Sequence, residues 1–113
     1  ARMPKPILKD NNLILLINDN INLLKELDKN ISIEFSHNSN EIFLNSDSEQ
    51  LSRAFLNLIK NSIESIQEKR LINADFKGNI DITLNNNVSD ISFVIIDNGL
   101  GFGILKENIK NDK

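Results

Sequence analysis

Apolar residues recur every three or four positions in two stretches of the chain, and this spacing predicts two amphipathic helices. The first helix is expected to begin after Asp10, a residue type that caps helix N-termini. Asp47 and Gln50 form a capping-box pattern before the second helix, which should run to about Lys69. The apolar positions that define the helices are Leu13, Leu16, Ile17, Ile21, Leu24 and Leu27 in the first and Leu51, Ala54, Phe55, Leu58, Ile59 and Ile66 in the second.

A period of two in the apolar residues, which is typical of strands, follows each helix. After the first helix it covers residues 31–35 and, beyond a polar turn, residues 42–44, which predicts a hairpin. After the second helix it covers residues 80–84 and 91–96, separated by three consecutive asparagines. The expected order is therefore helix, two strands, helix, two strands, with residues 91–96 as the last strand.

Length and composition limit the chain to one small domain and argue against several function classes. A chain of 113 residues suits a single domain. The net charge of −3 comes without a basic stripe, and few aromatic side chains can stack on bases, so nucleic acid is not expected as a partner. Without cysteine a thiolate metal site is impossible, and no apolar run reaches membrane-spanning length. We expect a cytoplasmic location.

The segment Asp97-Asn98-Gly99-Leu100-Gly101 follows the last predicted strand and has the composition of half a nucleotide pocket. A carboxylate there can accept a hydrogen bond from an amine, and the glycines leave bare backbone for a flat ring to approach. Asn57 and Asn61 stand four residues apart on the second helix and therefore project on one stripe. Together these residues suggest an adenine end and a phosphate and metal end.

Each of these signals also has a purely structural interpretation. Asparagine on a helix is usually solvated, and Asp-Asn-Gly after a strand is common turn chemistry, since Asn-Gly readily supplies a positive φ. Gly101 and a following segment that does not read as a partner strand argue against a simple turn. A dinucleotide-fold fingerprint fails because Ile104 stands where it needs glycine. His37, the sole histidine, suits an exposed hairpin better than a zinc site.

Two segments resemble one protein family in order and separation. Residues 50–65 resemble the N box of sensor histidine kinases, and residues 97–101 resemble their G1 box. The family is the GHKL group of ATPases and kinases. The resemblance implies the Bergerat fold, an α/β two-layer sandwich with helices on one face of a mixed sheet. Residues 1–6 further resemble the exit of the dimerisation helices in NtrY-type sensor kinases.

The resemblance implies a role for each matching residue. Asp97 would accept a hydrogen bond from the exocyclic amine of adenine, while Gly99 and Gly101 let the backbone close around the base. Asn61 would offer its amide oxygen to Mg²⁺. Asn57, as the catalytic position, stands where hydrolysing members carry a glutamate base. Since an amide is a poor base, this residue favours a kinase over an ATPase.

The resemblance divides the chain into a connector at residues 1–9 and a partial ATP-binding domain at residues 10–113. We expect this domain to be incomplete at its C-terminus, because the family's second glycine box, which forms the lid over the phosphates, has no counterpart before Lys113. The parent protein would transfer phosphate from ATP, with Mg²⁺, to a histidine of its own dimerisation domain and then to a response regulator of the NtrX type. It would be anchored in the inner membrane with this domain on the cytoplasmic side. The alternatives are a hydrolysing or chaperone-type GHKL module and a non-catalytic interaction domain.

The last predicted strand also raises an expectation about association. Its residues 93–96 are all apolar, so both of its faces should need cover. The family's missing C-terminal elements would help to provide that cover. The fragment is therefore expected to expose an unpaired edge, to self-associate and to be inactive alone.

Overall fold

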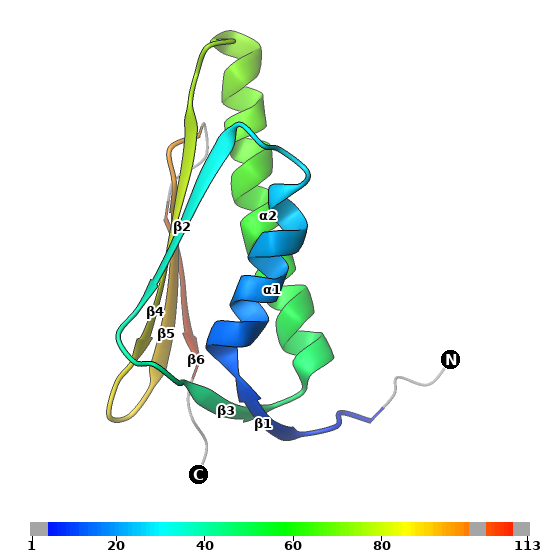
Figure 1. Cartoon of the computed structure of the whole chain (residues 1–113), viewed down its shortest axis with the longest axis vertical. Coiled ribbons are helices and arrows are strands. Elements are labelled where there is room, and N and C mark those ends of the chain that lie inside the picture. Colours follow the sequence, from blue (N-terminus) through cyan, green and yellow to red (C-terminus); the bar gives the residue numbers. More distant parts are fainter. Residues whose placement is uncertain (1–4, 100–103, 110–113) are drawn as a thin grey trace.

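The computed structural model describes residues 5–99 and 104–109, and it has two layers (Figure 1). Helices α1 and α2 lie together on one face of a four-stranded sheet, and two short strands form a separate ribbon at one end. This arrangement confirms the predicted α/β sandwich with helices on one face. The elements are β1 (Lys9–Asn12), α1 (Leu13–Lys25), β2 (Ile31–His37), β3 (Phe43–Ser46), α2 (Ser48–Ile72), β4 (Gly78–Asn86), β5 (Ile91–Asp97) and β6 (Ile104–Ile109).

The main sheet is mixed and has the strand order β2-β4-β5-β6. Strands β2 and β4 are parallel, with Ile31 opposite Gly78, whereas β5 is antiparallel to both β4 and β6. In the register of β4 and β5, Asp97 lies opposite Ile80. The end of β5 therefore meets the beginning of β4, at the end of the sheet next to the C-terminal half of α2 (Figure 1).

The hairpin predicted from residues 31–44 is wrong. Strand β2 pairs with β4, while β3 pairs with β1 in the separate ribbon. The polar segment after β2 does not fold back on itself, because Asn38 is held by the end of β4. Its Oδ1 accepts a hydrogen bond from the backbone N of Asn86 at 2.8 Å, and its Nδ2 donates to the carbonyl of Asn86 at 3.2 Å.

The prediction that residues 91–96 form the last strand is also wrong. The segment after Asp97 supplies β6, which pairs along β5 from Ile104 opposite Ile96 to Ile109 opposite Ile91. Strand β5 is thus paired on both sides, and β2 and β6 are the edges of the sheet within the described residues. The outer face of β5 keeps an apolar character, since Ile96 is 43% exposed. Self-association of the chain stays a prediction.

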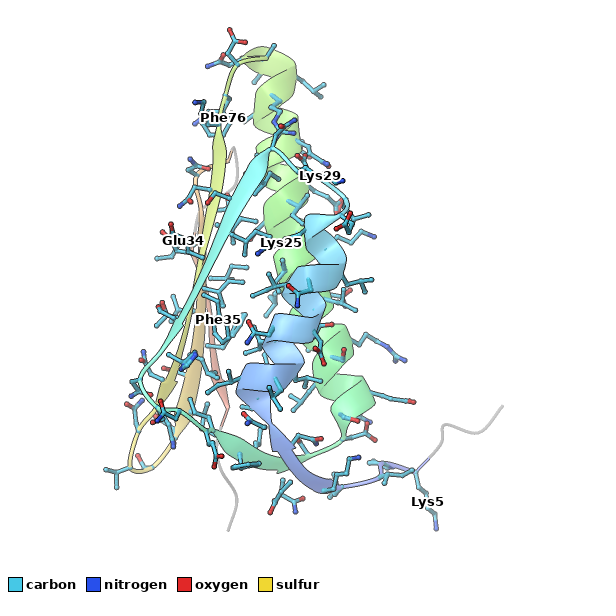
Figure 2. All side chains as sticks on the ribbon, viewed as in Figure 1. Lys5, Lys25, Lys29, Glu34, Phe35 and Phe76 are labelled. Atoms are coloured by element: carbon cyan, nitrogen blue, oxygen red, sulfur yellow. The ribbon has the colours of Figure 1, made fainter. Side chains whose placement is uncertain are left out.

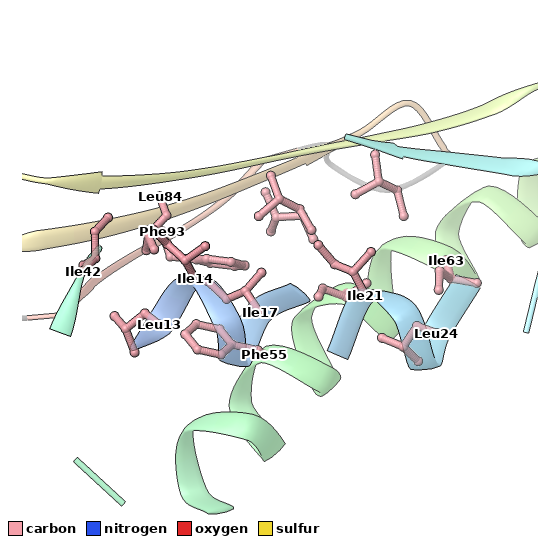
Figure 3. Close-up of a cluster of buried hydrophobic side chains, with 14 of the residues drawn as sticks. Leu13, Ile14, Ile17, Ile21, Leu24, Ile42, Phe55, Ile63, Leu84 and Phe93 are labelled. Carbon is pink, nitrogen blue, oxygen red and sulfur yellow. The ribbon is translucent and has the colours of Figure 1, made fainter. Parts of the chain in front are cut away.

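The core lies between the two helices and the inner face of the sheet (Figure 3). Alternate residues of β4 and β5 point inward, as the period of two predicts, and the rings of Phe55 on α2 and Phe93 on β5 are 4.9 Å apart. Figure 2 shows the same alternation on β2, where Phe35 points toward the helices and Glu34 away from them. Among the strand residues whose side chains the structure describes, the fully buried ones are Ile80, Ile82, Leu84, Ile91, Phe93 and Ile95.

Helix α1 begins two residues later than predicted. Asp10 lies in β1, whose pairing with β3 keeps the backbone extended, and Asn12 is the N-cap instead. Its side-chain oxygen accepts a hydrogen bond from the N–H of Ile14 at 3.1 Å. The helix ends at Lys25, so that Leu27 lies beyond it and is largely exposed.

Helix α2 is capped as predicted, by the Asp47 side chain, and it is tied to α1 at two points. Ser52 donates a hydrogen bond to Asn20, which is buried, and Arg70 forms an ion pair with Asp28 just after α1. The hydrogen bond from Arg70 holds the pKa of Asp28 below its ordinary value. The part of the chain that the structure describes has no helix long and apolar enough to cross a membrane.

Candidate functional site

Four polar residues of α2 form a stripe with a spacing of four: Asn57, Asn61, Ser65 and Lys69. In an α-helix this spacing places side chains on one face, and the stripe covers roughly 18 Å from its first to its last Cα. Asn57 and Asn61 are exposed, while Ser65 is half-buried. The sequence prediction for the two asparagines is therefore consistent with their positions, and the stripe continues beyond them.

Ser65 joins this stripe to the end of β5. Its Oγ donates a hydrogen bond to Oδ1 of Asp97 at 3.3 Å, and the N–H of Gly99 donates to the same oxygen at 2.9 Å. Within residues 5–99, Oδ2 of Asp97 accepts no hydrogen bond. The structure thus brings the N box and the G1 box together, with one carboxylate oxygen held and the other available.

Gly99 packs directly on α2. A Cβ placed on it would lie 2.5 Å from the carbonyl carbon of Ser65, 2.5 Å from its Oγ and 2.6 Å from the backbone N of Ile66. The φ angle of Gly99 is outside the left-handed region, so its conformation does not explain the glycine. The residue lies between two antiparallel strands, as the turn interpretation expected, yet the close approach to the helix is what excludes a side chain here.

Asn98 fixes the same segment to the beginning of β4. Its Oδ1 accepts from the N–H of Asn79 at 2.8 Å, and its Nδ2 donates to the carbonyl of Lys77 at 3.2 Å. Lys69 adds a contact from α2, because its Nζ donates to the carbonyl of Asn98 at 3.3 Å. The same Nζ lies 4.4 Å from the ring centre of Phe76, which Figure 2 labels near the C-terminal end of α2.

The sequence prediction missed Ser65, Lys69 and Asn98 as parts of the site. The helical spacing of four from Asn61 could have identified Ser65, because it continues the stripe already recognised. Asn98 gave no such signal, since asparagine before glycine is ordinary in a turn. Gly101, the last predicted site residue, lies outside the described residues.

His37 lies toward the opposite end of the main sheet from this site. It pairs with Leu84 at the opposite end of β4 from the residues that face Asp97. The side chain is exposed, its ring lies 5.3 Å from that of Phe35, and its Nδ1 is 2.8 Å from the carbonyl oxygen of Ser39. The exposed position is confirmed, although the hairpin around it is not.

A pocket of about 360 Å³ lies beside the C-terminal end of α2, separate from the stripe. The predicted site residues within the described chain do not line it. The guanidinium of Arg70 at its wall is already paired with Asp28. The lining residues are Asn30, Ser32, Arg70, Ala74, Asp75, Phe76, Lys77 and Gly78.

The residues at the junction of α2 and β5 fit the two ends of a nucleotide. Oδ2 of Asp97 is an acceptor for an amine, and the N–H of Gly99 holds the other carboxylate oxygen in place. The exposed amide of Asn61 can offer an oxygen to a hard cation. The amide of Asn57 has no useful basicity, so that it can position a group but not remove a proton from water.

Sequence comparison finds relatives among sensor histidine kinases, although no family profile matches the chain. The "putative sensor histidine kinase NtrY-like" of Rickettsia felis is 30% identical over 102 residues, which cover 90% of this chain and 16% of that protein. The protein of the same name from Rickettsia prowazekii gives the same identity and coverage. The chain thus spans about one sixth of the length of these relatives.

Solved structures with a similar backbone are histidine kinase catalytic domains. The catalytic domain of histidine kinase ThkA superposes with a TM-score of 0.71 at 21% identity, over 82% of this chain and 59% of that one. The chain has the fold of a histidine kinase catalytic domain. The mycobacterial sensor histidine kinase MprB, with a TM-score of 0.71 at 18% identity over 85% of this chain and 58% of that one, agrees.

A further structure holds histidine kinase ThkA in complex with the response regulator protein TrrA. It matches with a TM-score of 0.66 at 20% identity, over 80% of this chain and 25% of the kinase chain. The histidine kinase fold and the NtrY-like relatives together confirm the resemblance first recognised in the N box and the G1 box.

Proposed function

We propose that this chain is the ATP-binding part of a sensor histidine kinase. The parent protein transfers the γ-phosphate of ATP to a histidine and from there to a response regulator. The observation that carries the proposal is the hydrogen bond from Ser65 to Asp97, which joins the N-box helix to the G1 segment at one site. The NtrY-like relatives support the same activity.

At the adenine end, Oδ2 of Asp97 accepts a hydrogen bond from the exocyclic amine of the base. The hydrogen bonds from Ser65 and Gly99 to Oδ1 support this role, because they leave Oδ2 as the oxygen that can face a base. We assign Gly101 the same role from the G1 motif alone.

At the phosphate end, Asn61 offers its amide oxygen to Mg²⁺, and Asn57, the proposed catalytic residue, positions the reacting groups. When bound, ATP would supply the phosphoryl group and Mg²⁺ would neutralise part of its negative charge. Asn57 cannot act as a general base toward water, so the phosphoryl group is kept for the histidine. This argues against the hydrolysing and chaperone-type alternatives.

The partners and location follow from the same proposal. Residues 1–9 connect the ATP-binding domain, residues 10–113, to the kinase's own dimerisation and phosphoacceptor domain. The response regulator is of the NtrX type, in keeping with the NtrY-like relatives. The parent is anchored in the inner membrane, with this domain in the cytoplasm.

Phosphotransfer by the full-length protein tests the proposal. The protein is incubated with Mg²⁺ and ATP labelled on the γ-phosphate, and both acid-labile protein label and free phosphate are followed in time. We expect label on histidine that moves to an added NtrX-type regulator. Steady release of phosphate without protein label would favour a hydrolysing module, and no nucleotide binding in calorimetry would favour a non-catalytic interaction domain.

A further inference from the structure

We propose that Ser65 is a positioning residue that fixes the Asp97 carboxylate and thereby makes the site select adenine over guanine. The proposal rests on the proposed nucleotide-binding function and adds a residue outside the predicted set. The two carboxylate oxygens of Asp97 differ in their hydrogen bonds, because both donors bond to Oδ1.

Two donors from different elements converge on Oδ1 of Asp97. The Ser65 hydroxyl comes from α2 at 3.3 Å, and the Gly99 N–H comes from the segment after β5 at 2.9 Å. Together they restrain the plane of the carboxylate, which would otherwise rotate freely about a broad terminal torsion. The half-buried position of Asp97 leaves Oδ2 as the oxygen that can face a ligand.

Oδ2 of the restrained carboxylate discriminates between purines because it can only accept a hydrogen bond. Adenine carries an amine donor at the position where guanine carries a carbonyl acceptor. An acceptor held in place pairs with the donor and repels the other acceptor. A carboxylate that is free to rotate can instead turn toward the N–H groups on the neighbouring edge of guanine. Restraint of Asp97 is therefore what maintains the preference.

Helix α2 offers a matched control. Ser52 makes a bond of the same kind to Asn20 at 3.0 Å, and it lies in the first half of the helix, away from Asp97. Alanine at Ser52 or Ser65 removes one serine hydroxyl from the same helix, and alanine favours the helical conformation. Only the substitution at Ser65 removes a hydrogen bond to the Asp97 carboxylate.

The test compares the dissociation constants of ADP and GDP for the full-length protein and its Ser65→Ala and Ser52→Ala variants by calorimetry. Ser65→Ala should weaken ADP binding on the order of five-fold and reduce the ratio of GDP to ADP dissociation constants. Ser52→Ala should leave the ratio unchanged. Equal weakening of ADP and GDP by Ser65→Ala, or an unchanged ratio, would overturn the positioning role while leaving the proposed function intact. Failure of the unaltered protein to bind ADP would instead refute the proposed function, and the inference with it.

Discussion

Replacement of Gly99 by alanine tests the packing of the G1 segment on α2. The new Cβ would lie 2.5 Å from the backbone carbon of Ser65, whereas ordinary contacts begin at 3.4 Å. The segment would have to move away from the helix by about 0.9 Å. The helix cannot yield locally, because the overlapping atoms include its own backbone.

Overpacking of this kind costs about 1 to 3 kcal/mol. In a domain of this size each kcal/mol corresponds to a change in melting temperature of about 4 °C. We expect the variant to melt roughly 4 to 12 °C lower, and to bind ADP at least several-fold more weakly because the displaced segment carries Asp97 with it. Thermal unfolding by circular dichroism and calorimetric titration measure the two effects.

Gly78→Ala provides the control for this substitution. A Cβ at Gly78 would lie 2.4 Å from Cγ2 of Ile66, so it also overpacks the molecule, but at the beginning of β4 and against a side chain. It should lower the melting temperature with a smaller effect on ADP binding. If Gly99→Ala changes neither the melting temperature nor the affinity, the close packing of the segment on α2 is wrong.

Three further predictions concern the core, the phosphate end and the acid limit of stability. Phe93→Ala should lower the free energy of unfolding by about 3 to 5 kcal/mol in chemical denaturation, because it empties a fully buried position; a loss below about 1 kcal/mol would contradict the core assignment. Asn61→Ala should weaken the Mg²⁺-dependent part of ATP binding, whereas Asn57→Ala should mainly slow phosphotransfer in the full-length protein, and equal Mg-ATP affinity in Asn61→Ala and the parent would refute the metal role. The hydrogen bond from Arg70 lowers the pKa of Asp28 in the folded state, so its stabilisation is present above about pH 4 and is lost as the pH falls through the folded pKa; Asp28→Asn should flatten this acid limb of the stability curve, and an unchanged limb would refute the contribution.

The helices were predictable from the sequence because their signals are local. The spacing of apolar residues identified both, and the Asp47 side chain caps α2 as its motif indicates. The start of α1 was misplaced because residues 9–12 pair with β3, and Asp10 cannot reveal that long-range contact. The capping residue was predicted correctly for α2, where the preceding residue is not part of a strand that extends past the cap, and incorrectly for α1, where Asp10 lies within β1.

Strand partners were less predictable, since a period of two shows which face of a strand is buried but not its neighbour. The polar segment after β2 resembles a turn, yet Asn38 bonds to Asn86, 48 residues away. Strand β6 escaped prediction because Ile104-Leu105-Lys106-Glu107-Asn108-Ile109 does not alternate. Its pairing with β5 is a tertiary effect that the local pattern does not carry.

Some residues of the candidate site could likewise be predicted from the sequence and others could not. Asp97, Asn57 and Asn61 could be predicted as site residues because they match motifs and their chemistry is distinctive. Ser65 and Asn98 were missed, because serine on a helix and asparagine in a turn are common, and only the packing of α2 against β5 gives them a role. Residues that match a motif can therefore be predicted from the sequence, whereas the residues that hold them in place, such as Ser65 and Asn98, are harder to predict.

The most direct test of nucleotide binding at this site is ADP binding by the Asp97→Asn variant of the full-length protein. An asparagine can keep its carbonyl oxygen at the Oδ1 position, with the bonds from Ser65 and Gly99, so that only Oδ2 is exchanged for an amide N–H₂. The matched control is Asp81→Asn, an exposed carboxylate on the neighbouring strand. In Asp97→Asn, the new amide N–H₂ and the adenine amine would be two donors facing each other. This mismatch costs about 1 to 3 kcal/mol, which corresponds to a roughly 5- to 150-fold weaker affinity. We expect this loss in Asp97→Asn and none in Asp81→Asn; an unchanged ADP affinity in a correctly folded Asp97→Asn protein would refute adenine recognition by Asp97.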